Sequence, residues 1–178
     1  NISDCRAEVL TTSNSALSSN AVYCFAKSHR NLLWIGDEEG LTYYSYREKR
    51  IKSIPIRIGN EDFKYIHDIY ETADSELWLV SVGMGVVKAR IAGTPDNPVI
   101  VDAQRYIIND GELGSNYFFT IYAENEANLL FGNKGYGVFR YNETTNGLEP
   151  VSTHKYENMT LNNILAISKD SSNNYLFG

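Results

Sequence analysis

The 178-residue sequence has few cysteines, methionines, histidines and prolines, and it lacks an excess of basic charge. Lys and Arg number 16 against 22 Asp and Glu, which gives a net charge of −6 and argues against a nucleic-acid partner. No apolar run approaches the roughly 18 residues that a membrane span needs, so we expect no membrane contact by this segment. The two cysteines, Cys5 and Cys24, leave open whether they pair.

Long helices are also missing from the pattern, because no apolar stripe with a 3.6-residue period extends over ten or more residues. The chain is nevertheless 43% hydrophobic and 12% aromatic, with 13 tyrosines. This composition argues against disorder, and the length suffices for one domain with a sizeable core.

Catalytic signatures are scarce. The three histidines, His29, His67 and His154, lack the spacing of metal ligands, and no Gly-x-Ser-x-Gly elbow occurs. The glycine-rich segment GNKGYG, residues 132–137, lacks the Lys-Ser or Lys-Thr of a phosphate loop and fits a hairpin turn. His67 lies beside Asp68, where a functional histidine and an ordinary hydrogen-bonded one both remain open. We therefore predict no enzyme activity, no metal and no cofactor.

A repeat is the main feature of the sequence. Four ungapped segments of equal length align: residues 19–36, 63–80, 115–132 and 161–178. The second position of each segment is held by Asn20, Lys64, Asn116 and Asn162, and fourteen positions later come Trp34, Trp78, Leu130 and Leu176. The spacings are 44 (20 to 64), 52 (64 to 116) and 46 residues (116 to 162). This is the length of a four-stranded propeller blade.

Each unit begins with a short apolar run, a polar gap and a second short run that ends near glycine. A third run and a more polar fourth run, such as RIKSIPIR at residues 50–57, follow. The sequence thus predicts an all-β fold, a β-propeller fragment of four-stranded antiparallel blades. Its predicted parts are an orphan outer strand at 4–12, blades at about 17–58, 62–108 and 113–156, and a half blade at 159–178. Because a propeller closes with about four to eight complete blades, we expect a piece of a larger propeller.

The apolar pattern predicts how the blades pack. Val22 and Phe25 lie three apart on the first strand and point to opposite faces, so that strand should be buried on both sides. We expect Trp34 and Trp78 to be buried between blades. Gly36 and Gly40 are expected to use positive φ in the turn into the third strand.

The segment LSSNAVYCFAKSHRNLLWIGDEEGL, residues 17–41, resembles the two-component regulator propeller repeat. That repeat has an Asn-x-Val start, an apolar-Trp-Ile-Gly strand end and a Gly-Leu start to the next strand. The match is carried by Asn20, Val22, Leu33, Trp34, Ile35, Gly36, Gly40 and Leu41. The third unit matches through Asn116, Leu130, Gly132 and Gly137, whereas the second departs with Lys64 and Val80.

The resemblance implies the periplasmic sensor region of a bacterial hybrid two-component system. Members of that family resemble sensors of plant or host glycans, within an inner-membrane protein that carries a histidine kinase further along the polypeptide. It therefore implies a periplasmic location and an oligosaccharide ligand.

One face of such a propeller should carry the ligand, because the turns between second and third strands lie beside the entries to the first strands. The entries hold Asn20, Tyr65, Asn116 and Tyr117, and the turns hold Asp37, Glu38, Asn133, Lys134 and Tyr136. Aromatic rings stack on sugar C–H faces and amides bond hydroxyls, which suits an oligosaccharide. Asparagine at a strand entry can equally cap a turn.

Two other functions stay open. A propeller can serve in protein interaction or dimerisation without a small ligand, and a propeller enzyme would need a cluster of acids or histidines that we do not find. The open blade ends also predict self-association. One end carries Val22 or Phe25, and the unfinished end carries Ile164, Ile167 and Phe177.

Overall fold

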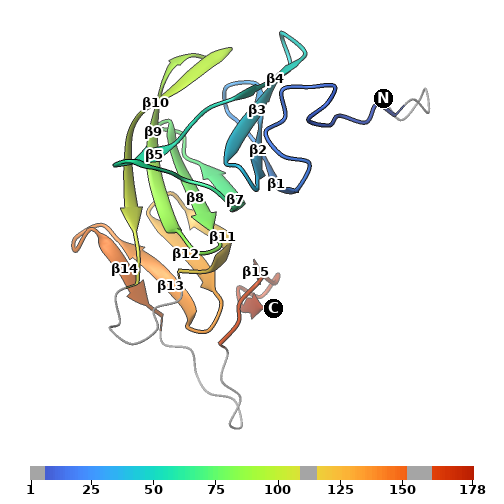
Figure 1. The fold of residues 1–178 in the computed structure, drawn as a ribbon. Helices are drawn as coiled ribbons and strands as arrows, with labels where there is room; N and C mark the ends of the chain where they lie inside the picture. The colour runs from blue at the N-terminus through green and yellow to red at the C-terminus, as the bar shows by residue number, and fades with distance from the viewer. Residues whose placement is uncertain (1–6, 109–115, 152–161) are drawn as a thin grey trace.

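The computed structural model describes residues 7–108, 116–151 and 162–178, and every regular element within them is a β-strand. The strands form three four-stranded antiparallel sheets and two two-stranded ones (Figure 1). This architecture agrees with the all-β, four-stranded pattern that the repeat predicts.

The strands of each sheet follow one another in chain order. The first sheet contains β1 (Val22–Lys27), β2 (Leu32–Asp37), β3 (Leu41–Ser45) and β4 (Arg50–Ser53). The second contains β7 (Ile66–Glu71), β8 (Glu76–Ser81), β9 (Gly85–Thr94) and β10 (Asn97–Tyr106). The third contains β11 (Phe118–Asn125), β12 (Asn128–Asn133), β13 (Gly137–Asn142) and β14 (Gly147–Pro150). The two-stranded sheets are β5 (Arg57–Ile58) with β6 (Glu61–Asp62), and β15 (Ile167–Lys169) with β16 (Tyr175–Phe177).

The first strands lie where the repeat predicts them. Strands β1, β7 and β11 each begin two residues after the matched positions Asn20, Lys64 and Asn116. Strand β15 begins later in its unit, five residues after Asn162. These first strands contact one another in order along the inside of the arrangement, and β4, β10 and β14 lie outside (Figure 1).

The core lies between the sheets. One cluster joins Leu32 and Trp34 of the first sheet to Leu77 and Leu79 of the second. A second cluster joins the second and third sheets around Trp78, and a third joins β12 and β13 to the last hairpin. Trp34 and Trp78 are both almost completely buried, so the predicted burial between sheets is confirmed. Burial of side chains of this size stabilises by about 1.5–3 kcal/mol each or more.

Gly36 has a different role from the expected one. Its φ is not positive, whereas Gly40 does turn the chain with φ of 138°. A Cβ on Gly36 would come within 2.6 Å of the Ile66 carbonyl oxygen, and a Cβ on Gly132 equally close to the Ile164 oxygen. Glycine at this position therefore lets the first strand of the next sheet approach the second strand closely.

The predicted outer strands are wrong in two places. Residues 4–6 of the predicted orphan strand 4–12 lie outside the described residues, and residues 7–12 form no strand. A turn occupies this region instead, in which the Thr11 backbone N–H donates to Asn14 Oδ1 at 2.7 Å. The fourth strand of the first sheet ends at Ser53, because Pro55 lacks the N–H that would continue the ladder. Ile54 and Ile56 turn into the core beside Phe63.

The first strand of the first sheet is not buried on both sides. Phe25 is 63% exposed, whereas the matched Ile69 of β7 is 5% exposed. The difference arises because the first sheet covers Ile69, and no other sheet of the described residues covers Phe25. Cys5 lies outside the described residues, which leaves the cysteine pairing a question. Burial raises the pKa of the Cys24 thiol to about 12, so this cysteine is an unreactive thiol.

Candidate functional site

The strand entries and the turns between second and third strands do lie side by side. The Tyr65 N–H donates to the Glu38 carbonyl oxygen at 3.1 Å, and the Tyr65 oxygen accepts from Val82 N–H at 3.2 Å. One sheet further on, Lys134 N–H donates to the Tyr117 oxygen at 2.9 Å. The first of these bonds ties the turn of the first sheet to the strand entry of the second, and the other two tie a strand entry to the turn of its own sheet. We call this side of the molecule the entry face.

Two of the predicted ligand residues hold the chain through their side-chain oxygens, and a third is buried. Asn20 Oδ1 accepts from Thr12 N–H at 2.9 Å, and Asn116 Oδ1 accepts from Ile108 N–H at 2.8 Å. Both contacts are of the capping kind that the sequence left open. Asn133 is fully buried at the end of β12, so its side chain does not reach the surface where a ligand would lie.

The other four predicted residues are exposed on the entry face. Tyr65 and Tyr117 are 41% and 44% exposed, and Lys134 and Tyr136 face solvent in the turn after β12. Tyr65 holds its position with a φ of 54°, a conformation that non-glycine residues adopt infrequently. The face therefore presents three phenol rings and one ammonium group.

Of the two acids predicted in the first turn, one is structural. Asp37 is fully buried. Its carboxylate accepts from Gly40 N–H at 3.0 Å and from the Ser18 hydroxyl at 2.6 Å, so it builds the turn. Glu38 is half-buried and accepts from the Ser19 hydroxyl at 3.3 Å. Of Asp37 and Glu38, Glu38 is thus the one with surface left for a ligand.

Sequence reasoning missed an aromatic row, which we define as Tyr23, His67 and Phe119. The Tyr23 and His67 rings stack with centroids 4.2 Å apart at 12°, and His67 meets Phe119 edge-on at 5.1 Å and 71°. Each residue lies three positions after the matched entry residue of its unit. An aromatic side chain at the same position of three successive units was the signal that could have revealed the row.

A β-bulge at the same register places each ring. The pairing of β1 with β2 shifts between Val22 and Cys24, that of β7 with β8 between Ile66 and Asp68, and that of β11 with β12 between Phe118 and Thr120. The row residue is the unpaired one in every case. A bulge re-aims a side chain relative to the regular alternation of a strand. Three bulges in register bring rings from three sheets into one line.

His67 and Asp68 act separately. Desolvation by burial lowers the pKa of His67, which keeps the imidazole neutral at neutral pH. Asp68 instead bridges β7 to β11, where its Oδ2 accepts from Ile121 N–H at 2.7 Å and from the Thr120 hydroxyl at 3.2 Å. Desolvation raises the pKa of Asp68 against the opposing effect of these hydrogen bonds.

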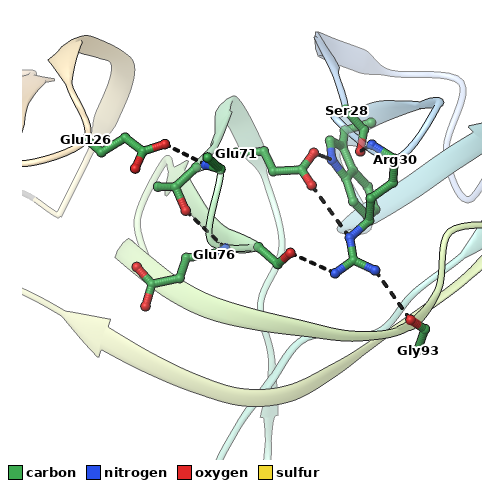
Figure 2. A network of polar contacts seen from close by, with 10 residues as sticks. Ser28, Arg30, Glu71, Glu76, Gly93 and Glu126 are labelled. Atoms are coloured by element: carbon green, nitrogen blue, oxygen red, sulfur yellow. Dashed lines mark hydrogen bonds and ion pairs between the residues drawn. The ribbon is translucent and has the colours of Figure 1, made fainter.

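A polar network locks the sheets together at the turns after the first strands (Figure 2). Trp34 Nε1 donates to Glu71 Oε2 at 2.7 Å, and Arg30 lies 3.8 Å from the other oxygen of Glu71. Arg30 also donates to Ser75 Oγ at 2.8 Å. Between the second and third sheets, the Ala73 N–H donates to Glu126 Oε1 at 2.5 Å. These contacts hold neighbouring sheets together, and they lie at the turns after the first strands and not on the entry face.

Within residues 7–108, 116–151 and 162–178, no group of three or more His, Cys, Asp or Glu side chains could hold a metal ion. The same part of the chain contains no helix long and apolar enough to cross a membrane.

Comparison with known proteins shows the class of fold. No protein-family model matches the chain, and no curated protein matches it. Among solved structures, the chain is similar to a bacterial extracellular domain that is named as part of a one-component or hybrid two-component system. Because the sequence identities are below 25%, this likeness shows a shared fold and carries no statement about function.

The particular structures are two crystal structures of the extracellular domain of BT4673 from B. thetaiotaomicron. One is named as a one-component system, with a TM-score of 0.67 and 18% identity over 95% of this chain. The other is named as a hybrid two-component system, with a TM-score of 0.66 and 18% identity over 91% of this chain. The chain spans 22% of the length of each of those domains.

Proposed function

We propose that this chain is a segment of a β-propeller in the extracytoplasmic part of a two-component sensor, and that it binds an oligosaccharide at the entry face. The observation that carries the proposal is the gathering of exposed rings, Tyr65, Tyr117 and Tyr136, where strand entries and turns of several sheets meet. Partly exposed rings beside a few polar groups are what a ligand site usually presents.

The sheet arrangement supports the propeller. Three four-stranded sheets repeat with their first strands inside and their fourth strands outside, and each packs face to face on the next. In this proposal further blades belong to a longer polypeptide, as does a histidine kinase inside the cell. The segment itself senses and has no catalytic role. The extracellular domains that share the fold are consistent with a periplasmic location.

Sugar chemistry suits the groups at the entry face. A tyrosine ring offers a flat apolar surface for the C–H face of a pyranose, and its hydroxyl can bond a sugar hydroxyl. The Glu38 carboxylate and the Lys134 ammonium add a strong acceptor and a strong donor for further hydroxyls. Exposure of the three rings to water in the free protein means that a sugar ring would replace water on them.

A glycan array probed with the intact chain tests this function. We expect binding to at least one class of oligosaccharide, and calorimetry on that glycan should show about tenfold weaker binding for Tyr65→Ala and for Tyr117→Ala. Val99→Ala, an exposed apolar residue on the outer strand β10, is the matched control and should bind like the parent. An array without a single binding glycan would contradict the proposal.

The second candidate function is association of copies through the uncovered face of the first sheet. A groove of about 370 Å³ lies there, lined mainly by apolar side chains that include Phe25, Leu33 and Tyr44. The residues at matched positions of the second sheet, Ile69 and Leu77, are buried by the first sheet. The same repeat positions are thus covered by a neighbouring sheet elsewhere, and we propose that a second copy covers them here.

Sedimentation velocity over a concentration series tests the association. We expect self-association that Phe25→Asp weakens at least tenfold, because a carboxylate would be buried in an apolar contact. Val99→Asp introduces the same charge on β10 and should leave the association unchanged. A parent chain that stays monomeric at high concentration would rule this candidate out.

A further inference from the structure

The aromatic row is not explained by core packing alone. The residues that precede two of its members, Ile66 and Phe118, are completely buried, whereas Tyr23 is 40% exposed and His67 and Phe119 are half-buried. A bulge in each of three sheets turns these rings out of the regular alternation, which a purely structural residue would not need. Tyr23 and His67 each cover one face of the other's ring, so a ligand would stack on the ring surface of the row that stays exposed, most of all on Tyr23.

The row continues into the entry face. The Glu38 N–H donates to the Ala21 carbonyl oxygen at 3.1 Å, and Val22 pairs with Asp37, so the turn that carries Glu38 lies beside the start of β1, where Tyr23 is. In agreement with this placement, the pKa of the Tyr23 phenol is raised, first by desolvation and then by the charges of Glu38, Tyr65 and Asp37. The matched position of the last unit is held by Leu165, an aliphatic residue that is 55% exposed. The row therefore meets the entry face at its Tyr23 end, beside the turn that carries Glu38.

The charge at the Tyr23 end is negative. Lys64 Nζ is paired with Glu39 at 2.5 Å, which leaves the Glu38 carboxylate uncompensated by that lysine. Asp37 adds a buried negative charge behind it. A carboxylate on the ligand would meet these groups with like charge, and like-charge juxtaposition disfavours a wrong partner strongly.

We propose that the aromatic row is a stacking platform for the flat face of an uncharged pyranose ring, and that Glu38 beside Tyr23 rejects acidic sugars. This inference rests on the proposed oligosaccharide function and names the sugar class for it. The sugar ring stacks on Tyr23. The neutral His67 ring packs between Tyr23 and Phe119 and keeps the Tyr23 ring in place, and Glu38 accepts a hydrogen bond from a ligand hydroxyl. No covalent step is involved.

The test uses the intact chain with a matched pair of probes, β-1,4-linked mannohexaose and the β-1,4-linked hexamer of mannuronic acid, and with the neutral glycans that bind on the array. These two hexamers share a backbone and differ at C6, where a hydroxymethyl group replaces a carboxylate. We expect neutral glycans to shift the His67 imidazole signals in NMR and the acidic hexamer to leave them unchanged. In the Glu38→Gln variant, the acidic hexamer should bind more tightly than it does to the parent, so its effect on the His67 signals should come closer to that of the neutral glycans.

Variants separate stacking from general structure. Tyr23→Ala and Phe119→Ala should weaken neutral-glycan binding about tenfold each, which corresponds to about 1.4 kcal/mol. Tyr23→Phe keeps the ring and should retain most of the affinity. Tyr46→Ala removes an exposed ring that packs on Tyr44, and it is the control that should bind like the parent. Circular dichroism and melting of each variant show that the fold is intact.

Each outcome decides one statement. Binding of a neutral glycan that Tyr23→Ala and Phe119→Ala leave unchanged would overturn the row as a platform, and the proposed function would stand. If the mannuronic acid hexamer binds as tightly as mannohexaose or more tightly, the statement that the site prefers uncharged sugars is wrong. Absence of any glycan binding, with His67 signals constant, would overturn both this inference and the proposed function.

Discussion

The junction between the first and second sheets and the junction between the second and third sheets place a tryptophan at the same position of the repeat but surround it differently. Trp34 donates its indole N–H to the buried carboxylate of Glu71, which Arg30 also approaches. Trp78 packs among Tyr106, Phe131 and Tyr141. One junction is polar at its centre and the other is aromatic.

The polar contact of the first junction depends on a single position. Glu71 is the last residue of β7, and the residue at the same position of the next unit is Ala123. With alanine there, no carboxylate reaches the Trp78 ring from β11, and Lys88 lies 5.4 Å from the centre of the ring instead. The repeat therefore determines that the indole is buried between sheets, and the neighbouring side chains determine whether the indole N–H meets a carboxylate or the ring packs among other aromatic rings.

The largest effect should come from removing either ring. Trp34→Ala and Trp78→Ala should each lower the free energy of unfolding by about 3–5 kcal/mol, because each leaves a large cavity between two sheets. A domain has only about 5–15 kcal/mol in total, so both variants should fold poorly. Urea unfolding followed by fluorescence of the remaining tryptophan measures this. A midpoint near that of the parent would show that the ring is not packed as described.

Glu71→Ala gives the first junction the residue that the second junction has. We expect a loss of about 1–3 kcal/mol, because the Trp34 indole N–H and the Arg30 guanidinium lose a buried acceptor. Glu71→Gln keeps an acceptor for the indole and should cost less than the alanine variant. Chemical denaturation of both variants decides this, and equal stability of Glu71→Ala and the parent would contradict the role of the network.

Phenylalanine substitutions sharpen the comparison further. Trp34→Phe removes a hydrogen bond as well as ring area, whereas Trp78→Phe removes area from an aromatic cluster. We expect Trp34→Phe to be the more destabilising of the two by about 1 kcal/mol, the usual contribution of one hydrogen bond. A double-mutant cycle of Trp34→Phe with Glu71→Gln should show coupling between the two sites. Strict additivity would mean that the 2.7 Å contact contributes nothing measurable.

The smallest effect concerns pH, through His67, whose ring touches both junctions at their inner edge. Its pKa is lowered in the folded protein by desolvation, so the unfolded chain binds the proton more readily. The contribution of neutral His67 to the free energy of unfolding is therefore complete above the pKa of the unfolded chain, about 6.5, and is lost as the pH falls through the lower pKa of His67 in the folded protein. Melting temperatures between pH 7.5 and pH 5 should decline less in His67→Gln than in the parent. Parallel declines would show that His67 does not contribute.

The sequence predicted what depends on spacing. The repeat located β1, β7 and β11 and the two buried tryptophans, because a strand and its hairpin partner keep the same separation in each unit. It also predicted that entries and turns share a face, which the Tyr65 and Tyr117 backbone bonds bear out. The outer strands were less predictable. Their pairing depends on local breaks such as Pro55, and their residues are polar enough to resemble loops.

The candidate site was only partly predictable, for a physical reason. A bulge adds an unpaired residue without changing the distance between matched positions, so the spacing of the repeat does not reveal it. His67 was singled out for its neighbour Asp68, yet its ring contacts Tyr23 and Phe119, which lie in other sheets. Asn133 looked like a turn residue, and burial at the end of β12 is a property of the packed sheets.

Ligand binding at the entry face can be mapped by backbone amide chemical shifts of the intact chain, titrated with a neutral oligosaccharide that binds on the array. We expect the perturbed amides to concentrate at the starts of the first strands, around Tyr23, Tyr65, His67 and Tyr117, with little change on β4, β10 and β14. Saturable changes centred on the outer strands, or none at all at the first-strand entries, would contradict it.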